Sequence, residues 1–296
     1  MQEQVDRFLR YLKDEKDYSG NTIAAYRNDL RQFVSLLDRA ASGAVGSWSE
    51  VDHQLIAAYG EYLEEQTYTP STVARKVASV KSFFSFMIDS ALLTDNPTTA
   101  LSAPKIEKQL PRIMSEAEVE RLLAQPAKGR LPKALRDRAL LELLYATGMR
   151  VSEAIALQLD DLDLAETCVF GVGRDGKKRQ LPLTPQAFEA LSAYLEKGRD
   201  ALLHHRLETT LFVNQRGRPL TRQGLWLIIK SYAEAADLGP GVTPHTLRHS
   251  CAAHRLARGG DLRQVRELLG HANLSTTQVY VDIANPRGEE SDAVPG

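Results

Sequence analysis

The segment TPHTLRH, residues 243–249, carries a histidine and an arginine that could bind an anion. Thr243 is a typical N-cap and Pro244 a typical first helical residue, so a helix is expected to begin here. His245 and Arg248 are three residues apart and share one face of that helix. Together with the unpaired backbone N–H groups of the helix start, they could bind a phosphate. Taken alone, the pair is more simply a surface histidine and a solvated arginine.

A second segment, LLGHANLSTTQVY at residues 268–280, places a histidine and a tyrosine around a break between two helices. Gly270 is expected to end one helix, and Ser275 to cap the next. His271 then lies at the junction, and Tyr280 lies inside the second helix. By itself, a tyrosine among apolar neighbours is more often a packed core residue.

A third segment, ATGMRVSE at residues 146–153, places Arg150 in a tight turn, where alone it would form an ordinary ion pair with Glu153. Two arginines, two histidines and a tyrosine brought together would suit transesterification at a phosphodiester. Guanidinium groups match the non-bridging oxygens, remain charged, and stabilise the negative charge of the transition state. A phenol, with an ordinary pKa of about 10, becomes nucleophilic when a base or nearby positive charge favours its phenolate.

The histidines also permit a different chemistry, which is zinc binding. His245 and His249 are four residues apart, as in zinc-binding helices, and His254 follows them. The residues between the first two are Thr-Leu-Arg, which supply no glutamate base, and the Arg248 cation would repel a metal ion. We therefore expect no metal site, and a chelator should leave the activity unchanged.

Helical periodicity dominates the elements that must position these residues. Apolar residues recur at helical spacing through both halves of the chain. Helices are predicted at 2–38 (interrupted near 19–21), 52–66, 71–89, after Ser115, and at 133–147, 185–197, 221–236, 244–258, 261–269 and 275–283. The stretch 167–182 instead favours a β-hairpin, because Asp175-Gly176 is typical of a two-residue type I′ turn. The predicted fold class is therefore mainly α with a small β-sheet (α+β).

The chain divides into two predicted domains. Their boundaries follow from Asn96-Pro97 and from the polar run between Pro104 and Pro111. We expect a helical N-terminal domain at 1–103, a linker at 104–111, a catalytic domain at 112–284 and a short tail at 285–296.

The composition excludes several classes of protein. The 296 residues include 43% hydrophobic and 25% charged residues, which is ordinary for a soluble globular protein. The sequence has no apolar run of membrane-spanning length and no signal-peptide pattern. The two cysteines cannot form a disulfide framework, so a cytoplasmic location is expected. The net charge of −1 argues mildly against a nucleic-acid partner, but the second half carries a positive excess.

The three segments and the hairpin together resemble the tyrosine recombinase (phage integrase) family, and most closely its Xer-type site-specific recombinases. The similarity rests on ATGMRVSEAIAL, on the HxxR…LLGH…Y arrangement, and on NTIAAYRNDL in the first domain. The resemblance implies an N-terminal SAM-like core-binding domain that clamps DNA, and a C-terminal catalytic domain. It also implies site-specific cutting and rejoining of DNA without metal or ATP, in chromosome dimer resolution, chromosome partition and cell division.

The resemblance also implies a role for each matching residue. Arg150 and Arg248 would clamp the scissile phosphate. His245 would assist by proton transfer or hydrogen bonding, and His271 would donate to a non-bridging oxygen. Tyr280 would attack phosphorus and form a 3′-phosphotyrosyl link.

One departure from the family pattern concerns the hairpin lysine that protonates the leaving 5′-oxygen. In this chain Arg174 occupies its position, and arginine is a reluctant proton donor. A two-residue loop would place Arg174 and Lys177 opposite each other on one face of the hairpin. We therefore expect Lys177 to be the general acid and Arg174 a phosphate contact, although both could simply bind DNA.

The resemblance further implies the partners of this protein. They are a double-stranded DNA recombination site and a homotetramer, or a heterotetramer with a paralogous recombinase, with a DNA translocase as a further candidate and no membrane. In the family, a C-terminal helix after the tyrosine packs on a neighbouring protomer, and in this chain that helix is truncated or unclear. The expected tetramer therefore has less support from the sequence than the expected chemistry. The expected DNA contacts are Arg75, Lys76, Lys81, Arg174, Lys178 and Arg222.

Related functions remain as alternatives. An integrase of a mobile element or a type IB topoisomerase would share the same chemistry. A non-catalytic DNA-binding regulator on the same fold would form no covalent complex with DNA.

Overall fold

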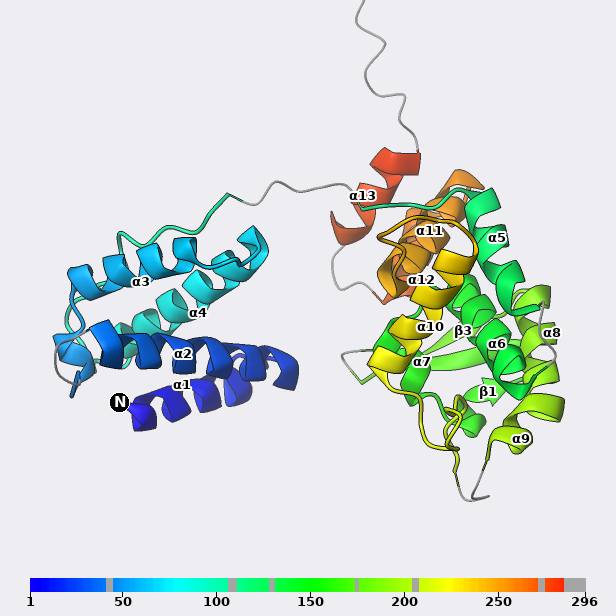
Figure 1. Ribbon diagram of the computed structural model, residues 1–296, viewed down its shortest axis with the longest axis horizontal. Helices are drawn as coiled ribbons and strands as arrows, with labels where there is room; N and C mark the ends of the chain where they lie inside the picture. Colours follow the sequence, from blue (N-terminus) through cyan, green and yellow to red (C-terminus); the bar gives the residue numbers. More distant parts are fainter. Residues whose placement is uncertain are drawn as a thin grey trace, which may run out of the picture. The chain divides into compact units, whose positions relative to one another are not determined.

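The computed structural model divides the chain into two compact units, residues 1–109 and 110–296 (Figure 1). It describes residues 1–40, 45–105, 111–127, 131–173, 176–203, 208–270 and 275–284. None of the helices in these ranges is both long and apolar enough to cross a membrane.

The first unit is a bundle of helices around an aromatic core. Its elements are α1 (Gln2–Asp14), α2 (Gly20–Ala40), the 3-10 helix η1 (Trp48–Glu50), α3 (His53–Glu65) and α4 (Pro70–Asp89). Phe33 and Phe84 are fully buried and pack edge to face, with Trp48 and Phe83 against them. Thr69 caps α4 by accepting from the Thr72 N–H, and Pro70 occupies the first turn.

The second unit contains most of the helices and the small sheet. Its helices are α5 (Glu116–Ala127), α6 (Pro132–Thr147), α7 (Val151–Ala156), η2 (Leu159–Asp161), α8 (Pro185–Ala193), η3 (Tyr194–Arg199, a π-helical turn), α9 (Asp200–Leu202), α10 (Arg222–Ala235), α11 (Pro244–Ala257), α12 (Leu262–Leu269) and α13 (Ser275–Ala284). Most of α6 is buried, including Leu140, Leu141, Leu143 and Leu144, because other elements cover it on several sides. The mainly helical class with a small sheet is confirmed.

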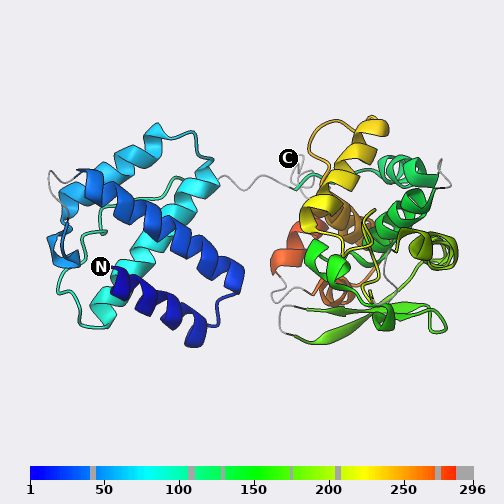
Figure 2. The same ribbon diagram turned by 60° about the horizontal axis from the view of Figure 1, so that its bottom comes forward.

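The sheet has three antiparallel strands, β1 (Leu162–Asp163), β2 (Cys168–Val172) and β3 (Lys178–Pro182), in that order. It lies along one side of the helices of this unit (green arrows in Figure 2). The pairing joins Val169 to Leu181, both of them buried, and Val172 to Lys178. The register is therefore fixed by two apolar residues that face the core.

This register corrects the predicted hairpin loop. The Gly173 N–H donates to the Lys177 carbonyl at 2.9 Å, so these two residues close the loop and three residues connect them. Gly176 has a φ of +74°, which suits the left-handed last position of a three-residue loop. Lys177 therefore faces Gly173 rather than Arg174, and Arg174 itself lies outside the described residues.

Candidate active site

A glycine turn between α6 and α7 begins the site. Gly148 has a φ of +59° and ends α6. A Cβ atom there would lie 2.8 Å from Leu269 Cδ2 and 3.2 Å from Cys251 Sγ, so only glycine lets this turn approach α11 and α12. The close approach brings the Gly148 carbonyl to 2.5 Å from Nη1 of Arg248. The turn also places Arg150 at the N-cap of α7.

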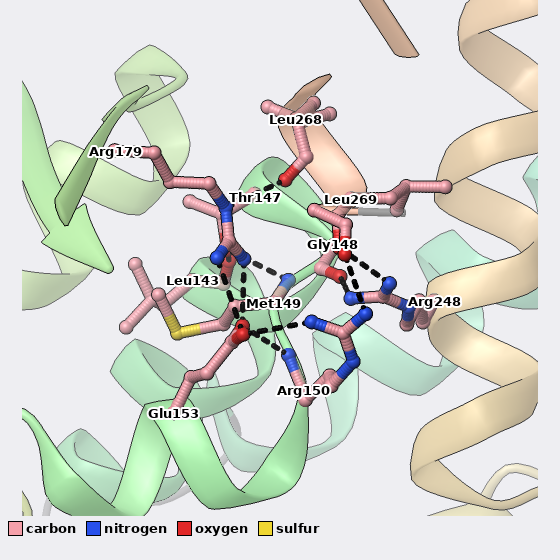
Figure 3. Close-up of polar contacts among 11 residues, drawn as sticks. Leu143, Thr147, Gly148, Met149, Arg150, Glu153, Arg179, Arg248, Leu268 and Leu269 are labelled. Carbon is pink, nitrogen blue, oxygen red and sulfur yellow. Dashed lines mark hydrogen bonds and ion pairs between the residues drawn. The ribbon is translucent and has the colours of Figure 1, made fainter. Parts of the chain in front are cut away.

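The carboxylate of Glu153 joins two arginines from different elements, as Figure 3 shows. It accepts from the backbone N–H of Arg150 at 2.9 Å and from its Nη1 at 3.0 Å. Arg179, on β3, donates to both carboxylate oxygens, at 2.7 and 3.2 Å. Burial opposes ionisation of Glu153, but the hydrogen bonds from Arg179 and Arg150 outweigh it and keep its pKa below the usual value.

The two predicted clamp arginines are anchored to neighbouring carbonyl groups at the end of α12. Arg248 Nη2 donates to Leu269 O at 2.6 Å, and Arg150 Nη2 donates to Gly270 O at 2.7 Å. Burial and, next, the positive charge of Arg150 lower the pKa of Arg248 to about 10, so Arg248 stays charged at neutral pH. The backbone thus holds two like charges close together, an arrangement that an anion would stabilise.

Tyr280 packs against α11 and α12 with only 3% of its surface exposed. Its hydroxyl lies 2.5 Å from Nδ1 of His249, and the ring centroids are 5.4 Å apart. Burial raises the pKa of Tyr280, while the positive charge of Arg248 partly opposes that increase. At neutral pH the phenol is therefore protonated, and it lies beside both an acceptor, His249, and a cation, Arg248.

The structure thus gathers four of the predicted residues into one neighbourhood: Arg150, His245, Arg248 and Tyr280. His245 is exposed, and its ring stacks 6.3 Å from that of His249. His271 lies outside the described residues. The histidines proposed as zinc ligands have other contacts, since His254 Nδ1 lies 2.9 Å from the Tyr145 hydroxyl. Among the described residues, no cluster of three or more His, Cys, Asp or Glu side chains could hold a metal ion.

The predicted DNA contacts lie in different environments. Lys178 and Arg222 are exposed, and Lys178 Nζ lies 3.1 Å from Asp161. In the first unit, Lys81 Nζ donates to the Leu101 carbonyl at 2.9 Å. Arg75 is half-exposed and forms an ion pair with the buried Asp29.

The structure corrects the prediction for Lys76. This lysine is only 3% exposed, and its ammonium group bonds Asp29 at 3.3 Å and also the Gln32 side chain. It lies 4.9 Å from the centre of the Tyr68 ring as well. Lys76 therefore neutralises a buried carboxylate and does not present its charge to a DNA phosphate.

Two residues of the site are missing from the sequence prediction. Arg179 alternates with the buried Leu181 on β3, and this period of two was a usable signal that its side chain faces inward. The sequence pattern marks His249 only as a possible zinc ligand. Its contact with a tyrosine 31 residues away has no local signature.

Comparison with known proteins identifies the class. Residues 112–287 match the Phage integrase family, and residues 5–90 match the Phage integrase N-terminal SAM-like domain. A tyrosine recombinase XerC from Herpetosiphon aurantiacus is 47% identical over 292 residues, covering 99% of this chain and 94% of the relative. A tyrosine recombinase XerD from Halalkalibacterium halodurans is 41% identical, covering 96% and 94%.

Solved structures agree with these sequence matches. The XerA recombinase superposes with a TM-score of 0.53 at 28% identity, covering 96% of this chain and 95% of that one. XerH bound to a palindromic difH substrate superposes with a TM-score of 0.71 at 23% identity, covering 96% and 92%, which shows a shared fold. The chain belongs to the phage integrase family. Within that family it is a Xer-type tyrosine recombinase, a site-specific DNA recombinase.

Proposed function

We propose that Tyr280 attacks the scissile phosphate of a DNA recombination site. The products are a 3′-phosphotyrosyl link and a free 5′-hydroxyl, and the 5′-hydroxyl of another strand rejoins the DNA by the reverse attack. The observation that carries this proposal is the position of the Tyr280 phenol beside Arg248, with Arg150 anchored next to Arg248. The phosphotyrosyl bond conserves the ester energy, so the proposal needs neither ATP nor a metal.

The other groups act on the phosphate. Arg150 and Arg248 bind the non-bridging oxygens, His271 donates to one of them, and His245 assists by proton transfer or hydrogen bonding. Because the Tyr280 side chain is almost fully buried, DNA binding must open the surrounding residues enough for the phosphate to reach its hydroxyl.

Capture of the covalent complex tests the proposal. The full chain is incubated with a nicked suicide duplex, and the protein–DNA adduct is isolated under denaturing conditions and its DNA sequenced. The wild type should form the adduct and Tyr280→Phe should not. A wild type that binds DNA but forms no adduct would contradict the proposal in favour of a non-catalytic regulator.

Lys177 remains our proposed general acid for the leaving 5′-oxygen. Its expected pairing with Arg174 is wrong, so this assignment depends on its exposed position near the hairpin loop and on the chemistry of its ammonium group. A substrate with a 5′-bridging sulfur needs no acid, because a thiolate is a good leaving group. That substrate should restore cleavage to Lys177→Ala, and failure to do so would contradict the assignment.

We propose that the cellular role is chromosome dimer resolution in the cytoplasm, performed by a tetramer on two synapsed sites. The relatives named XerC and XerD, each matching nearly the whole chain, support this role. Recombination by this chain alone on a captured site would indicate a homotetramer. Recombination only after a paralogous recombinase is added would indicate a heterotetramer. If a DNA translocase is also required, cells that lack it should fail to recombine the sites.

DNA binding is proposed to use both units, with residues 1–103 as the clamping domain and residues 112–284 as the catalytic domain. Arg75, Lys81, Lys178, Arg222 and Arg174 are the proposed backbone contacts. Removing one such contact should weaken binding to all sequences alike and reduce the salt dependence of the affinity.

A further inference from the structure

His249 lies against the atom that the proposed function makes the nucleophile. Its Nδ1 atom is 2.5 Å from the Tyr280 hydroxyl, which is hydrogen-bond distance. His245, the histidine that matches the family motif, stands one helical turn away and is exposed. Of these two histidines, His249 is the one with a direct contact to the phenol oxygen.

The direction of this hydrogen bond follows from acid strength. Burial and then the positive charges of His245 and Arg248 lower the pKa of His249 to about 4, so its imidazole is neutral at pH 7. A phenol is a far stronger acid than a neutral imidazole N–H, and an imidazole nitrogen is a good acceptor. The Tyr280 hydroxyl therefore donates, and the Nδ1 lone pair accepts.

We propose that His249 is a catalytic residue that takes the proton of Tyr280 during DNA cleavage. As the bond from the Tyr280 oxygen to phosphorus forms, the O–H bond breaks and its proton moves to Nδ1. The bond from phosphorus to the 5′-oxygen breaks, and that oxygen receives a proton from the general acid. In the rejoining step His249 returns its proton to Tyr280. This inference rests on the proposed function and names the proton acceptor within it.

The surrounding charges make the basicity of His249 depend on whether DNA is bound. Among the described residues, the titratable groups that act on His249 or Tyr280 are His245, Arg248 and the buried thiol of Cys251 on α11. Arg150 adds a further positive charge next to Arg248. Without DNA, burial and the positive charge around His249 disfavour an imidazolium. The negative charge of a bound phosphate offsets this positive charge, so the basicity of His249 rises when the substrate is in place.

The chain offers a matched control on the same helix. His254 is also on α11, and its Nδ1 lies 2.9 Å from the hydroxyl of Tyr145, so it forms a second histidine–tyrosine pair. Neither member of that pair belongs to the proposed machinery. His249→Asn and His254→Asn therefore make the same change in similar pairs, and only the first affects the nucleophile.

The test measures single-turnover formation of the covalent adduct by the full chain between about pH 6 and 9. The substrate is a suicide duplex with a 5′-bridging sulfur, so that protonation of the leaving group does not limit the rate. Asparagine places an acceptor oxygen near the former Nδ1 but cannot take a proton. His249→Asn should slow cleavage about 100- to 10,000-fold, the usual contribution of a general base. Its rate should rise about tenfold per pH unit, because hydroxide must then remove the proton, whereas the wild type and His254→Asn should show a weaker dependence.

Three results would overturn the inference. The first is cleavage by His249→Asn with the rate and pH profile of the wild type. The second is slow cleavage by His249→Ala combined with normal cleavage by His249→Asn. That result would mean that the residue only positions the tyrosine. The third is a slow His249→Asn with the wild-type pH profile, and this slope is informative even if part of the variant is unfolded. Absence of any adduct with the wild type would instead refute the proposed function itself.

Discussion

Replacing Arg179 should destabilise the catalytic unit, although this residue is not expected to touch DNA. Arg179→Ala removes two charge-assisted hydrogen bonds to Glu153 and one at 3.2 Å to the Leu268 carbonyl. The side chains of Arg179 and Glu153 are only 16% and 5% exposed. Loss of one partner of a buried pair costs about 3–5 kcal/mol. Arg150 still compensates Glu153, so we expect the lower end, about 3 kcal/mol of unfolding free energy.

Thermal unfolding with a matched neighbour tests this magnitude. A loss of about 3 kcal/mol corresponds to a decrease of roughly 6–12 °C in the Tm of a domain of this size. Lys178→Ala removes the same charge from the adjacent residue of β3. The Lys178 side chain is 64% exposed in its ion pair with Asp161, so loss of this pair should cost less than about 1 kcal/mol. Trp226 lies in the second unit and Trp48 in the first, so fluorescence in a Trp48→Phe background reports the second unit. Equal melting of the two variants would refute the buried network as a source of stability.

Three further outcomes follow from the structure. Gly148→Ala should lower the unfolding free energy by about 2–4 kcal/mol, since it combines a left-handed backbone with a contact of 2.8 Å to Leu269, and unchanged melting would contradict this reason. The pKa of Glu153 is lowered on folding, so its ionised form stabilises the fold above about pH 4.5, the ordinary value, and this stabilisation is lost as the pH falls through the lowered value. Melting temperatures measured at decreasing pH should therefore fall less for Glu153→Gln than for the wild type. Lys76→Met should destabilise the first unit by about 3 kcal/mol, since Arg75 still compensates Asp29, but should leave the salt dependence of DNA affinity unchanged. Arg222→Ala should instead reduce that slope by about one without changing the melting.

Local sequence signals predicted the elements that carry the site. Thr243 caps α11 and Pro244 is its first residue, as expected, and Gly270 ends α12 with a φ of +62°. These predictions are confirmed. They could be made from the sequence because capping and left-handed backbone positions depend on residues close in sequence. The strands of the hairpin are also where they were expected.

Loop length and burial of charge were harder to predict, because both depend on distant contacts. A glycine after an aspartate suits both two-residue and three-residue hairpin loops. The choice is made by the pairing of Val169 with Leu181 against the core. Likewise, nothing local distinguishes Lys76 from an exposed lysine, and its burial is explained by contacts with Asp29 and Gln32, which are 47 and 44 residues away.

The charges of the site argue that it is built to be completed by an anion. Arg150 and Arg179 bind one carboxylate, that of Glu153, and Arg248 lies close enough to interact with its charge, so the described cluster carries more positive than negative charge. Backbone carbonyls of Gly148, Leu269 and Gly270 hold two of these guanidinium groups in place but cannot neutralise them. Burial and, next, this repulsion lower the pKa of Arg248. A phosphate would relieve the repulsion and offset the charges that keep His249 a weak base. The same electrostatic excess would thus account both for the proposed phosphate binding and for the proposed proton acceptor, whose basicity would rise when DNA is bound.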